Sequence, residues 1–186
     1  MKRIFDLFIA ILLLVLLLIP MVLIALVVRF STKGPALYWS DRVGKNNQLF
    51  KMPKFRTMII NTPALATHCL SDPNAYLTPI GGFLRNFSLD ELPQIFSVIK
   101  GDMSFVGPRP ALFNQEDLIA LRTEKGVDKL LPGISGWAQV NGRDELSISD
   151  KVRLDEEYLK FNSFWQDIKI LLLTLLKVIK RDGVSH

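Results

Sequence analysis

Residues 7–28 form one apolar stretch, LFIAILLLVLLLIPMVLIALVV, without a charged or hydrogen-bonding side chain. A helix needs roughly 20 apolar residues to cross a bilayer, so the stretch predicts membrane insertion. It accounts for much of the 49% hydrophobic content, which is high for a soluble chain. Two basic residues precede the stretch, as in a signal peptide. Two more follow it where a small-residue cleavage pattern would stand, which favours a retained segment.

Pro20 interrupts this stretch, removes one backbone donor and disfavours helical angles at Ile19. The positive-inside rule is best satisfied if both ends stay cytoplasmic, because basic residues flank each end: Lys2 and Arg3, then Arg29 and Lys33. A proline-bent helix that enters one leaflet and returns meets both conditions. A simple kinked span is the alternative, since membrane helices tolerate proline. The residues by themselves leave both interpretations open.

The remaining composition excludes several classes of protein. The net charge is +5, with 23 basic and 18 acidic residues, which is too balanced for a nucleic-acid-binding protein. Cys69 is the only cysteine, so no internal disulfide forms and a reducing compartment is expected. With only two histidines, His68 and the terminal His186, a histidine-based metal site is not expected. Neither a phosphate-binding P-loop nor a dinucleotide-binding glycine motif occurs.

After the apolar stretch, the pattern predicts an α/β fold that is predominantly helical with short β elements. Residues 33–58 read as short extended pieces around a turn at Gly44 to Asn47, and residues 59–78 read as a loop. Helices are predicted at about 90–99, 114–126, 149–161 and 163–181.

The last of these helices is amphipathic. Its apolar face is edged by basic residues; the face comprises Ile168, Leu171, Leu172, Leu175, Leu176 and Ile179, and the edge Lys169, Lys177, Lys180 and Arg181. This pattern favours a helix that lies in a membrane interface, and a core helix of the soluble domain is the alternative. We therefore divide the chain into an N-terminal membrane helix, residues 1–30, and a membrane-associated cytoplasmic domain, residues 31–186, which includes the interfacial helix 163–181.

The segment FSLDELPQ, residues 87–94, places two acids just before a proline. Ser88 and Glu91 fit a capping box, whereas Asp90 as the cap would put Pro93 in the first helical turn, where its missing N–H is harmless. A helix start is also positive and suits an anion. A helix-capping role therefore accounts for both acids without a catalytic function, unless the neighbouring residues indicate a catalytic site.

Those neighbours are cations set in irregular or turn-rich segments: Lys54, Arg56, Arg85, Arg109 and Arg143. Guanidinium groups match phosphate oxygens in a bidentate manner, so the set predicts a diphosphate clamp. Two acids beside such a clamp can hold a divalent cation, or one acid can attack phosphorus. The pattern indicates phosphoryl transfer at a membrane face.

Three long motifs resemble the bacterial sugar transferases, the small monotopic phosphoglycosyl transferases that initiate glycan assembly. They are KFRTM (54–58), TPIGGFLRNFSLDELPQIFSVIKGDMSFVGPRP (78–110) and PGISGWAQVNGR (132–143), and the resemblance covers nearly the whole chain. It implies transfer of a sugar phosphate from a UDP-sugar to polyprenyl (undecaprenyl) phosphate, with release of UMP and use of Mg²⁺. It also implies the bacterial inner membrane, with the active site on the cytoplasmic face.

The resemblance further assigns roles to residues. Asp90 matches the family's nucleophile, which forms a phospho-sugar aspartate, and Glu91 matches its partner, which is expected to help hold Mg²⁺. Arg85, Arg109 and Arg143 match positions near the phosphates, and Lys54 and Arg56 lie in a matching motif. Pro20 matches the break of a re-entrant helix, which favours that topology. The implied partners are the UDP-sugar, the lipid phosphate and the bilayer, with homo-oligomerisation left open.

Three positions depart from the family pattern: Ile19 before the helix break, Pro53 before the KFRTM motif, and Pro79, where arginine is common. They affect local geometry and leave the two acids in place. Two other functions use the same residues. One is a metal-dependent phosphohydrolase of lipid diphosphates; the other is a non-enzymatic polybasic membrane adaptor.

Overall fold

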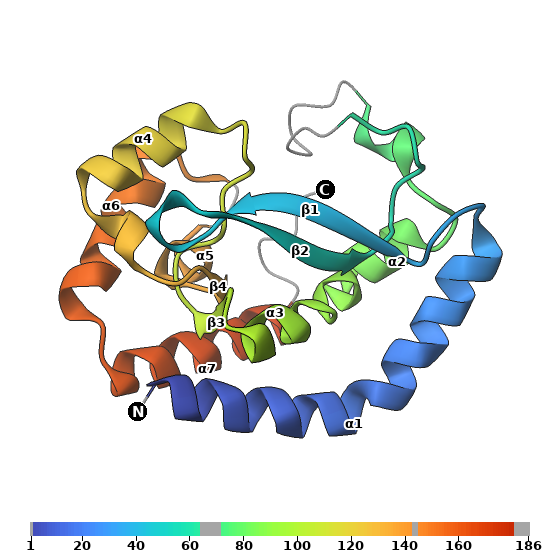
Figure 1. Cartoon of the computed structure of the whole chain (residues 1–186), viewed down its shortest axis with the longest axis horizontal. Helices are drawn as coiled ribbons and strands as arrows, with labels where there is room; N and C mark the ends of the chain where they lie inside the picture. Colours follow the sequence, from blue (N-terminus) through green and yellow to red (C-terminus); the bar gives the residue numbers. More distant parts are fainter. Residues whose placement is uncertain (1, 64–71, 143–144, 181–186) are drawn as a thin grey trace.

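A computed structural model of the chain describes residues 2–63, 72–142 and 145–180. The protein is mostly helical with short strands and begins with a long apolar helix, as the sequence predicts (Figure 1). In chain order the elements are α1 (Lys2–Ser31), β1 (Leu37–Val43), η1 (Lys45–Asn47), β2 (Leu49–Phe55), η3 (Pro73–Tyr76), α2 (Gly81–Asn86), η4 (Leu89–Glu91), α3 (Gln94–Lys100), β3 (Ser104–Val106), α4 (Glu116–Glu124), η5 (Val127–Lys129), β4 (Gly133–Ser135), α5 (Trp137–Val140), α6 (Ile148–Phe161) and α7 (Phe164–Lys180).

Strands β1 and β2 form an antiparallel hairpin around the turn expected from the sequence. Pro53 lies inside β2, opposite Trp39. A two-stranded sheet consists of edge strands only, so a proline can face away from the partner strand without the loss of a ladder hydrogen bond. The hairpin crosses the middle of the molecule, with α1 and α7 below it in the view of Figure 1.

The first turns of α1 are attached to the rest of the chain by polar contacts. Arg3 donates from Nη1 and Nη2 to the carbonyl oxygens of Val98 and Ile99, at 2.5 and 2.8 Å. These bonds give two carbonyl groups at the end of α3 a hydrogen-bond donor. Lys2 forms a 2.5 Å ion pair with Asp167 of α7. Asp6 is 2% exposed and accepts hydrogen bonds from β3. The N-terminal end of α1 is therefore fixed to three elements of the domain.

The other end of α1 packs against the same domain. Met21 and Val28 are buried in a cluster with Phe55 of β2 and Leu84 of α2. Between its ends α1 contains Pro20, and Figure 1 shows the helix bend along its length and rise toward β1. A proline is a recognised cause of such a bend. Both ends of the apolar helix thus lie on one domain.

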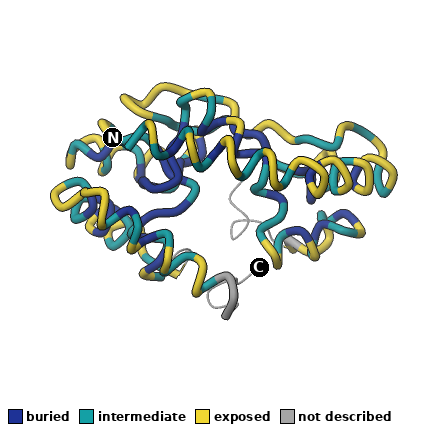
Figure 2. The backbone as a smooth tube through the Cα atoms, turned by 90° about the horizontal axis from the view of Figure 1, so that it is seen from below, coloured by how far each residue is buried: buried dark blue, intermediate teal, exposed yellow. Residues whose placement is uncertain are grey.

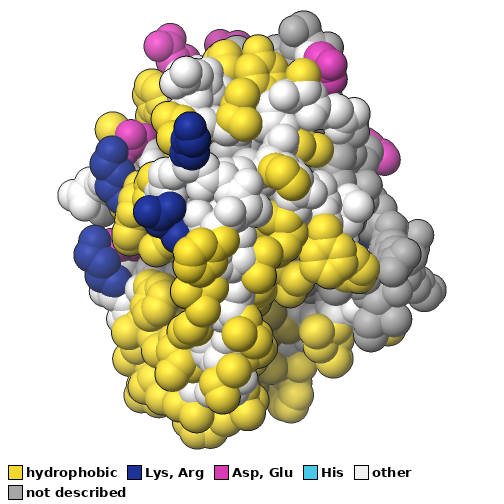
Figure 3. All heavy atoms as spheres, turned by 90° about the vertical axis from the view of Figure 1, so that its right-hand side faces the viewer, with side chains coloured by type: hydrophobic (Ala, Val, Ile, Leu, Met, Phe, Trp, Pro, Cys, Tyr) yellow, Lys and Arg dark blue, Asp and Glu magenta, His cyan; other side chains and the backbone are white. Residues whose placement is uncertain are grey.

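The outward surface of α1 is apolar and open. It is the one helix in the described part of the chain that is long and apolar enough to cross a membrane, and only 11% of its most apolar window is buried. On α7, Leu172, Leu175 and Leu176 are also more than half exposed, whereas Ile170 is fully buried. The side chains of Ile179, Lys180 and Arg181 lie outside what is described. Buried residues gather toward the middle of the molecule (Figure 2), and one end of the surface carries mostly apolar side chains, with basic ones above them (Figure 3).

Asp6 provides a test of how the helix is anchored. Asp6→Ala would leave the Ser104 hydroxyl and the Phe105 amide without their acceptor, and these groups are buried. We expect a loss of about 1–3 kcal/mol in stability, seen as a lower thermal midpoint in a fixed detergent. Asp41→Ala removes an acid that is 41% exposed and pairs with Lys51, and should change the midpoint little. Equal effects of the two substitutions would contradict the anchoring role.

Candidate active site

Asp90 and Glu91 lie in the short 3-10 turn η4, between α2 and α3. Ser88 precedes the turn in a left-handed conformation, with φ of 53°, and its side chain makes no capping hydrogen bond. Helix α3 begins only at Gln94, with Pro93 in the cap position and no side-chain cap. The helix-cap interpretation of the two acids is therefore wrong. Ser88 turns the chain sharply through its left-handed conformation, and the Glu91 carboxylate forms ion pairs instead of a cap.

Glu91 binds two of the cations that the sequence singles out. Its Oε1 accepts from Nζ of Lys54 at 2.7 Å and from Nη2 of Arg109 at 3.1 Å. The Lys54 and Glu91 side chains are 15% and 14% exposed, and Arg109 is 32% exposed. Such partly buried pairs are less screened than surface pairs. Glu91 thereby joins strand β2 to the loop that follows β3.

Asp90 is 7% exposed, and its carboxylate accepts no hydrogen bond from the described part of the chain. Burial raises the pKa of Asp90, Lys54 lowers it, and the neighbouring Glu91 raises it again. Arg85 and Arg109 act more weakly to lower it. The acid is therefore held among cations without being tied to one of them, which leaves its oxygens able to react or to bind a ligand.

Arg85, at the end of α2, is positioned by the segment after β2. Its Nε donates to the Thr57 hydroxyl at 3.1 Å, and Nη2 lies 3.6 Å from the sulfur of Met58. Burial lowers the pKa of Arg85, and Asp90 and Glu91 oppose that change. The KFRTM motif thus supplies Lys54 directly and orients Arg85 through Thr57.

The turn that carries Arg109 depends on close backbone packing between two glycine-containing loops. Gly107 donates to the Ser135 carbonyl, and Gly133 donates to the Pro108 carbonyl, each at 2.9 Å. A Cβ at Gly133 would lie 2.1 Å from the nitrogen of Gly107, so a larger residue cannot occupy this position. This requirement explains why GPRP and PGISG are both rich in glycine and proline.

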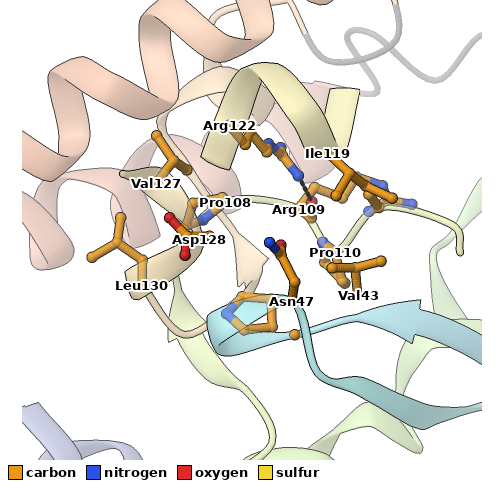
Figure 4. A pocket seen from close by; sticks show the side chains of 13 residues that line it. Val43, Asn47, Pro108, Arg109, Pro110, Ile119, Arg122, Val127, Asp128 and Leu130 are labelled. Atoms are coloured by element: carbon orange, nitrogen blue, oxygen red, sulfur yellow. Dashed lines mark hydrogen bonds between the residues drawn. The ribbon is translucent and has the colours of Figure 1, made fainter. Parts of the chain in front are cut away.

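A buried ion pair supports the same turn from behind. Arg122 of α4 donates from Nη1 to the carbonyl oxygen of Arg109 at 2.8 Å (Figure 4), and its Nε and Nη2 bind Oδ2 of Asp155 at 3.0 and 2.6 Å. Asp155 is 1% exposed, and burial raises its pKa. The backbone of Arg109 is fixed by α4 and α6, which leaves its guanidinium directed to Glu91. Sequence patterns did not identify this support.

The cavity shown in Figure 4 lies beside this turn. It is about 30 Å³ in volume and is lined by residues that include Asn47, Arg122 and Asp128. A space of that size suits a water molecule rather than a substrate. We therefore place the candidate site at Asp90 and Glu91, which do not line this cavity.

Arg42 is a further cation at this site, and the sequence analysis did not identify it. It lies on β1, donates from Nη1 to the Pro110 carbonyl at 3.1 Å and from Nε to the Ser40 hydroxyl at 3.0 Å. Burial, together with the nearby Arg109, lowers the pKa of Arg42 to about 10, and Glu91 opposes this. Alternation along the hairpin could have found it, since Arg42 and Lys54 occupy the same face of two paired strands.

One of the other predicted cations, Arg56, does not join this group. Arg56 is 4% exposed and lies near the end of α1, where its Nη2 donates to the Thr32 hydroxyl at 2.7 Å. Its Nε and Nη1 have no hydrogen-bond partner among the described residues. Arg56 is not among the charges that shift the pKa of Asp90. Arg143 lies outside the described residues. The structure thus brings together Asp90, Glu91, Lys54, Arg85 and Arg109, and adds Arg42.

The acids suit a magnesium ion better than a metal held by protein alone. No group of three or more His, Cys, Asp or Glu side chains that could hold a metal occurs among the described residues. Mg²⁺ is usually held by one or two carboxylates together with substrate phosphates and water. Asp90 and Glu91 are adjacent carboxylates, and the oxygens of Asp90 accept no hydrogen bond from the described residues. The donor set therefore fits Mg²⁺ bound together with a phosphorylated substrate.

Comparison with known proteins gives relatives along the whole chain. The uncharacterized sugar transferase EpsL of Bacillus subtilis is 40% identical over 188 residues, which cover 100% of this chain and 91% of EpsL. The undecaprenyl-phosphate glucose phosphotransferase of Komagataeibacter xylinus is 41% identical, and the UDP-glucose:undecaprenyl-phosphate glucose-1-phosphate transferase of Escherichia coli is 39% identical. These two alignments cover 96% and 95% of this chain, but only 36% and 40% of the relatives' own lengths.

A family model described as bacterial sugar transferase matches residues 1–181. The match includes the apolar helix, both acids and every predicted cation of the site. The chain therefore belongs to the bacterial sugar transferase family.

Proposed function

We propose that the protein transfers a sugar 1-phosphate from a UDP-sugar to polyprenyl phosphate and releases UMP. The observation that carries this proposal is the Asp90 carboxylate, buried among Lys54, Arg85 and Arg109 without a hydrogen bond from the described residues. Two relatives similar to this chain are named for undecaprenyl-phosphate glucose chemistry, which supports the same acceptor class. The reaction would be the first membrane step of glycoconjugate assembly in a bacterium.

In the first step, an oxygen of Asp90 attacks the phosphorus that bears the sugar. A bond forms between that oxygen and phosphorus, and the bond from phosphorus to the bridging oxygen breaks. UMP leaves with the bridging oxygen and its electron pair. Among the cations, Lys54 and Arg85 have the largest electrostatic effect on Asp90. They stabilise the negative charge that spreads over the phosphoryl oxygens.

In the second step, an oxygen of the lipid phosphate attacks the same phosphorus. The phosphorus–aspartate bond breaks, the lipid diphosphate-sugar forms, and Asp90 returns as a carboxylate. Glu91 keeps Lys54 and Arg109 in place through both of its ion pairs. Mg²⁺, which Asp90 and Glu91 would hold together with the substrate, would neutralise part of the diphosphate charge.

The contacts of α1 support a proposal for how the protein lies on the membrane. Its N-terminal end binds α3, β3 and α7, and its C-terminal end packs on β2 and α2, so both ends belong to one folded domain. A domain lies on one side of the bilayer. We therefore propose that α1 is re-entrant and that Pro20 allows it to turn back. We further propose that α7 lies in the interface with its exposed leucines toward lipid, with the site on the cytoplasmic face.

The nucleophile assignment predicts the behaviour of Asp90→Asn. Asparagine keeps the shape of the side chain but cannot attack phosphorus as a carboxylate does, so turnover should fall by at least about a thousandfold. UMP release from UDP-sugars, measured with polyprenyl phosphate in detergent, is the readout. Asp102→Asn, which changes an acid paired with Lys100 outside the site, should keep normal activity.

Near-normal turnover in Asp90→Asn would contradict the nucleophile assignment, and a wild-type protein that releases no UMP from any UDP-sugar would favour the adaptor function. UMP release that proceeds equally well without polyprenyl phosphate would instead favour a hydrolase.

The charges around Asp90 predict opposite pH shifts for two variants. Asp90 must be ionised to attack, and Glu91 raises its pKa whereas Lys54 lowers it. Glu91→Gln should therefore move the acid limb of kcat to lower pH, and Lys54→Gln should move it to higher pH, each by about 1 unit. The pH dependence of the rate of UMP release at saturating substrate concentrations measures the shift in each variant. A shift in the same direction for both variants would show that another group controls the acid limb.

The topology of α1 can be tested by labelling. In a Cys69→Ser background, a cysteine tag before residue 1 and Lys45→Cys in the exposed hairpin turn should react with a membrane-impermeant thiol reagent from the same side. Both should react in inverted vesicles, and neither should react in intact cells. Reaction of the two positions from opposite sides would establish a spanning helix.

A further inference from the structure

Arg42 is a partly buried cation of the site to which the sequence motifs assign no role. The end of β1 pairs with the loop that carries Arg109. Arg42 and Leu112 form an antiparallel β-bridge through their backbones, and the Val43 amide donates to the Ala111 carbonyl at 2.9 Å. Two of the three guanidinium nitrogens of Arg42 bind Ser40 and Pro110. Nη2 has no hydrogen-bond partner within the described part of the chain. The side chain is thus held firmly while one donor group remains available.

The charges of the described residues at the site favour an anionic ligand. Arg42, Lys54, Arg85 and Arg109 are four cations that act on each other or on the two acids, Asp90 and Glu91. Two positive charges are left over among the described residues. Arg42 and Arg109 lie close enough to repel each other, and burial increases that repulsion. A phosphate group would be attracted to these cations and would accept a hydrogen bond from Nη2 of Arg42.

The electrostatic interactions among these residues indicate which phosphate of the ligand each cation binds. Asp90 is influenced by Lys54, Arg85 and Arg109, whereas Arg42 is not among the groups that shift its pKa. Arg42 instead interacts with Arg109 and Glu91. The contacts have the same order: Arg109 binds Glu91, the neighbour of Asp90, at 3.1 Å, and Arg42 binds the carbonyl of Pro110, the residue after Arg109. In a phosphoryl transfer the attacking and leaving oxygens lie roughly in line, so the group beyond the attacked phosphorus is the leaving group.

We propose that Arg42 and Arg109 together form the binding site for the nucleotide's own phosphate, the one that departs as part of UMP. This inference rests on the proposed function and deepens it. Lys54 and Arg85 then serve the phosphorus that bears the sugar, and Arg109 contacts both phosphates. When the bridging oxygen leaves with its electron pair, the added charge appears beside two guanidinium groups that are already in place.

The decisive comparison is the binding of UMP and of uridine, which differ only in the phosphate. Arg42→Gln retains a side-chain donor for the Pro110 carbonyl but removes the charge. We expect it to weaken UMP binding about tenfold or more and to leave uridine binding unchanged, with each ligand measured by competition against UDP-sugar turnover. Arg42→Lys should recover part of the UMP affinity. Lys51→Gln removes an exposed cation, 64% exposed, from the same hairpin and should change neither affinity.

Equal weakening of UMP and uridine would show that Arg42 only supports the Pro110 turn, and would overturn the proposal. Unchanged UMP affinity in a folded Arg42→Gln protein would overturn it as well, including the case in which only transfer to the lipid becomes slower. If the wild-type protein neither binds UMP nor releases it from a UDP-sugar, the proposed function itself fails. That result is distinct from a failure of Arg42 alone.

Discussion

The two ion pairs of Glu91 connect the parts of the chain that make up the site. One carboxylate oxygen binds Lys54 of β2 and Arg109 of the loop after β3, so segments far apart in the sequence meet around Asp90. Each partner is supported independently: Lys54 by the hairpin, and Arg109 by the glycine contacts and by Arg122. These contacts position the cations in the absence of a ligand, and such preorganisation is the condition for electrostatic stabilisation of a transition state.

The apolar helix α1 and the candidate site are held together by shared contacts. Phe55 packs against α1 directly after Lys54, so the strand that carries a site cation also contacts the apolar helix. The polar contacts of Lys2, Arg3 and Asp6 hold the opposite end of α1 to the same domain. A water-soluble donor and a membrane-bound acceptor would therefore meet beside a helix whose outer surface is apolar. This arrangement relates the exposed face of α1 to the proposed chemistry.

Much of the site could be predicted from the sequence because the residues stand in distinctive local motifs. The two acids and the cations Lys54, Arg85 and Arg109 do come together, and the hairpin, the late helices and the mostly helical fold agree with the patterns. The capping interpretation was wrong because Ser88 adopts a left-handed conformation that no local rule requires. Arg42 was not predicted because its place at the site depends on the pairing of β1 with β2. Arg56 was predicted at the site but binds Thr32 near the end of α1 instead.

The central claim is that Asp90 becomes covalently bonded to the sugar phosphate. Mass spectrometry of the protein after incubation with a UDP-sugar and Mg²⁺, without lipid acceptor, tests this directly. The account predicts a peptide that contains Asp90 and carries the mass of a phospho-sugar, which disappears when polyprenyl phosphate is added. An unmodified Asp90 in protein that transfers sugar phosphate normally, or a modification on another residue, would contradict it.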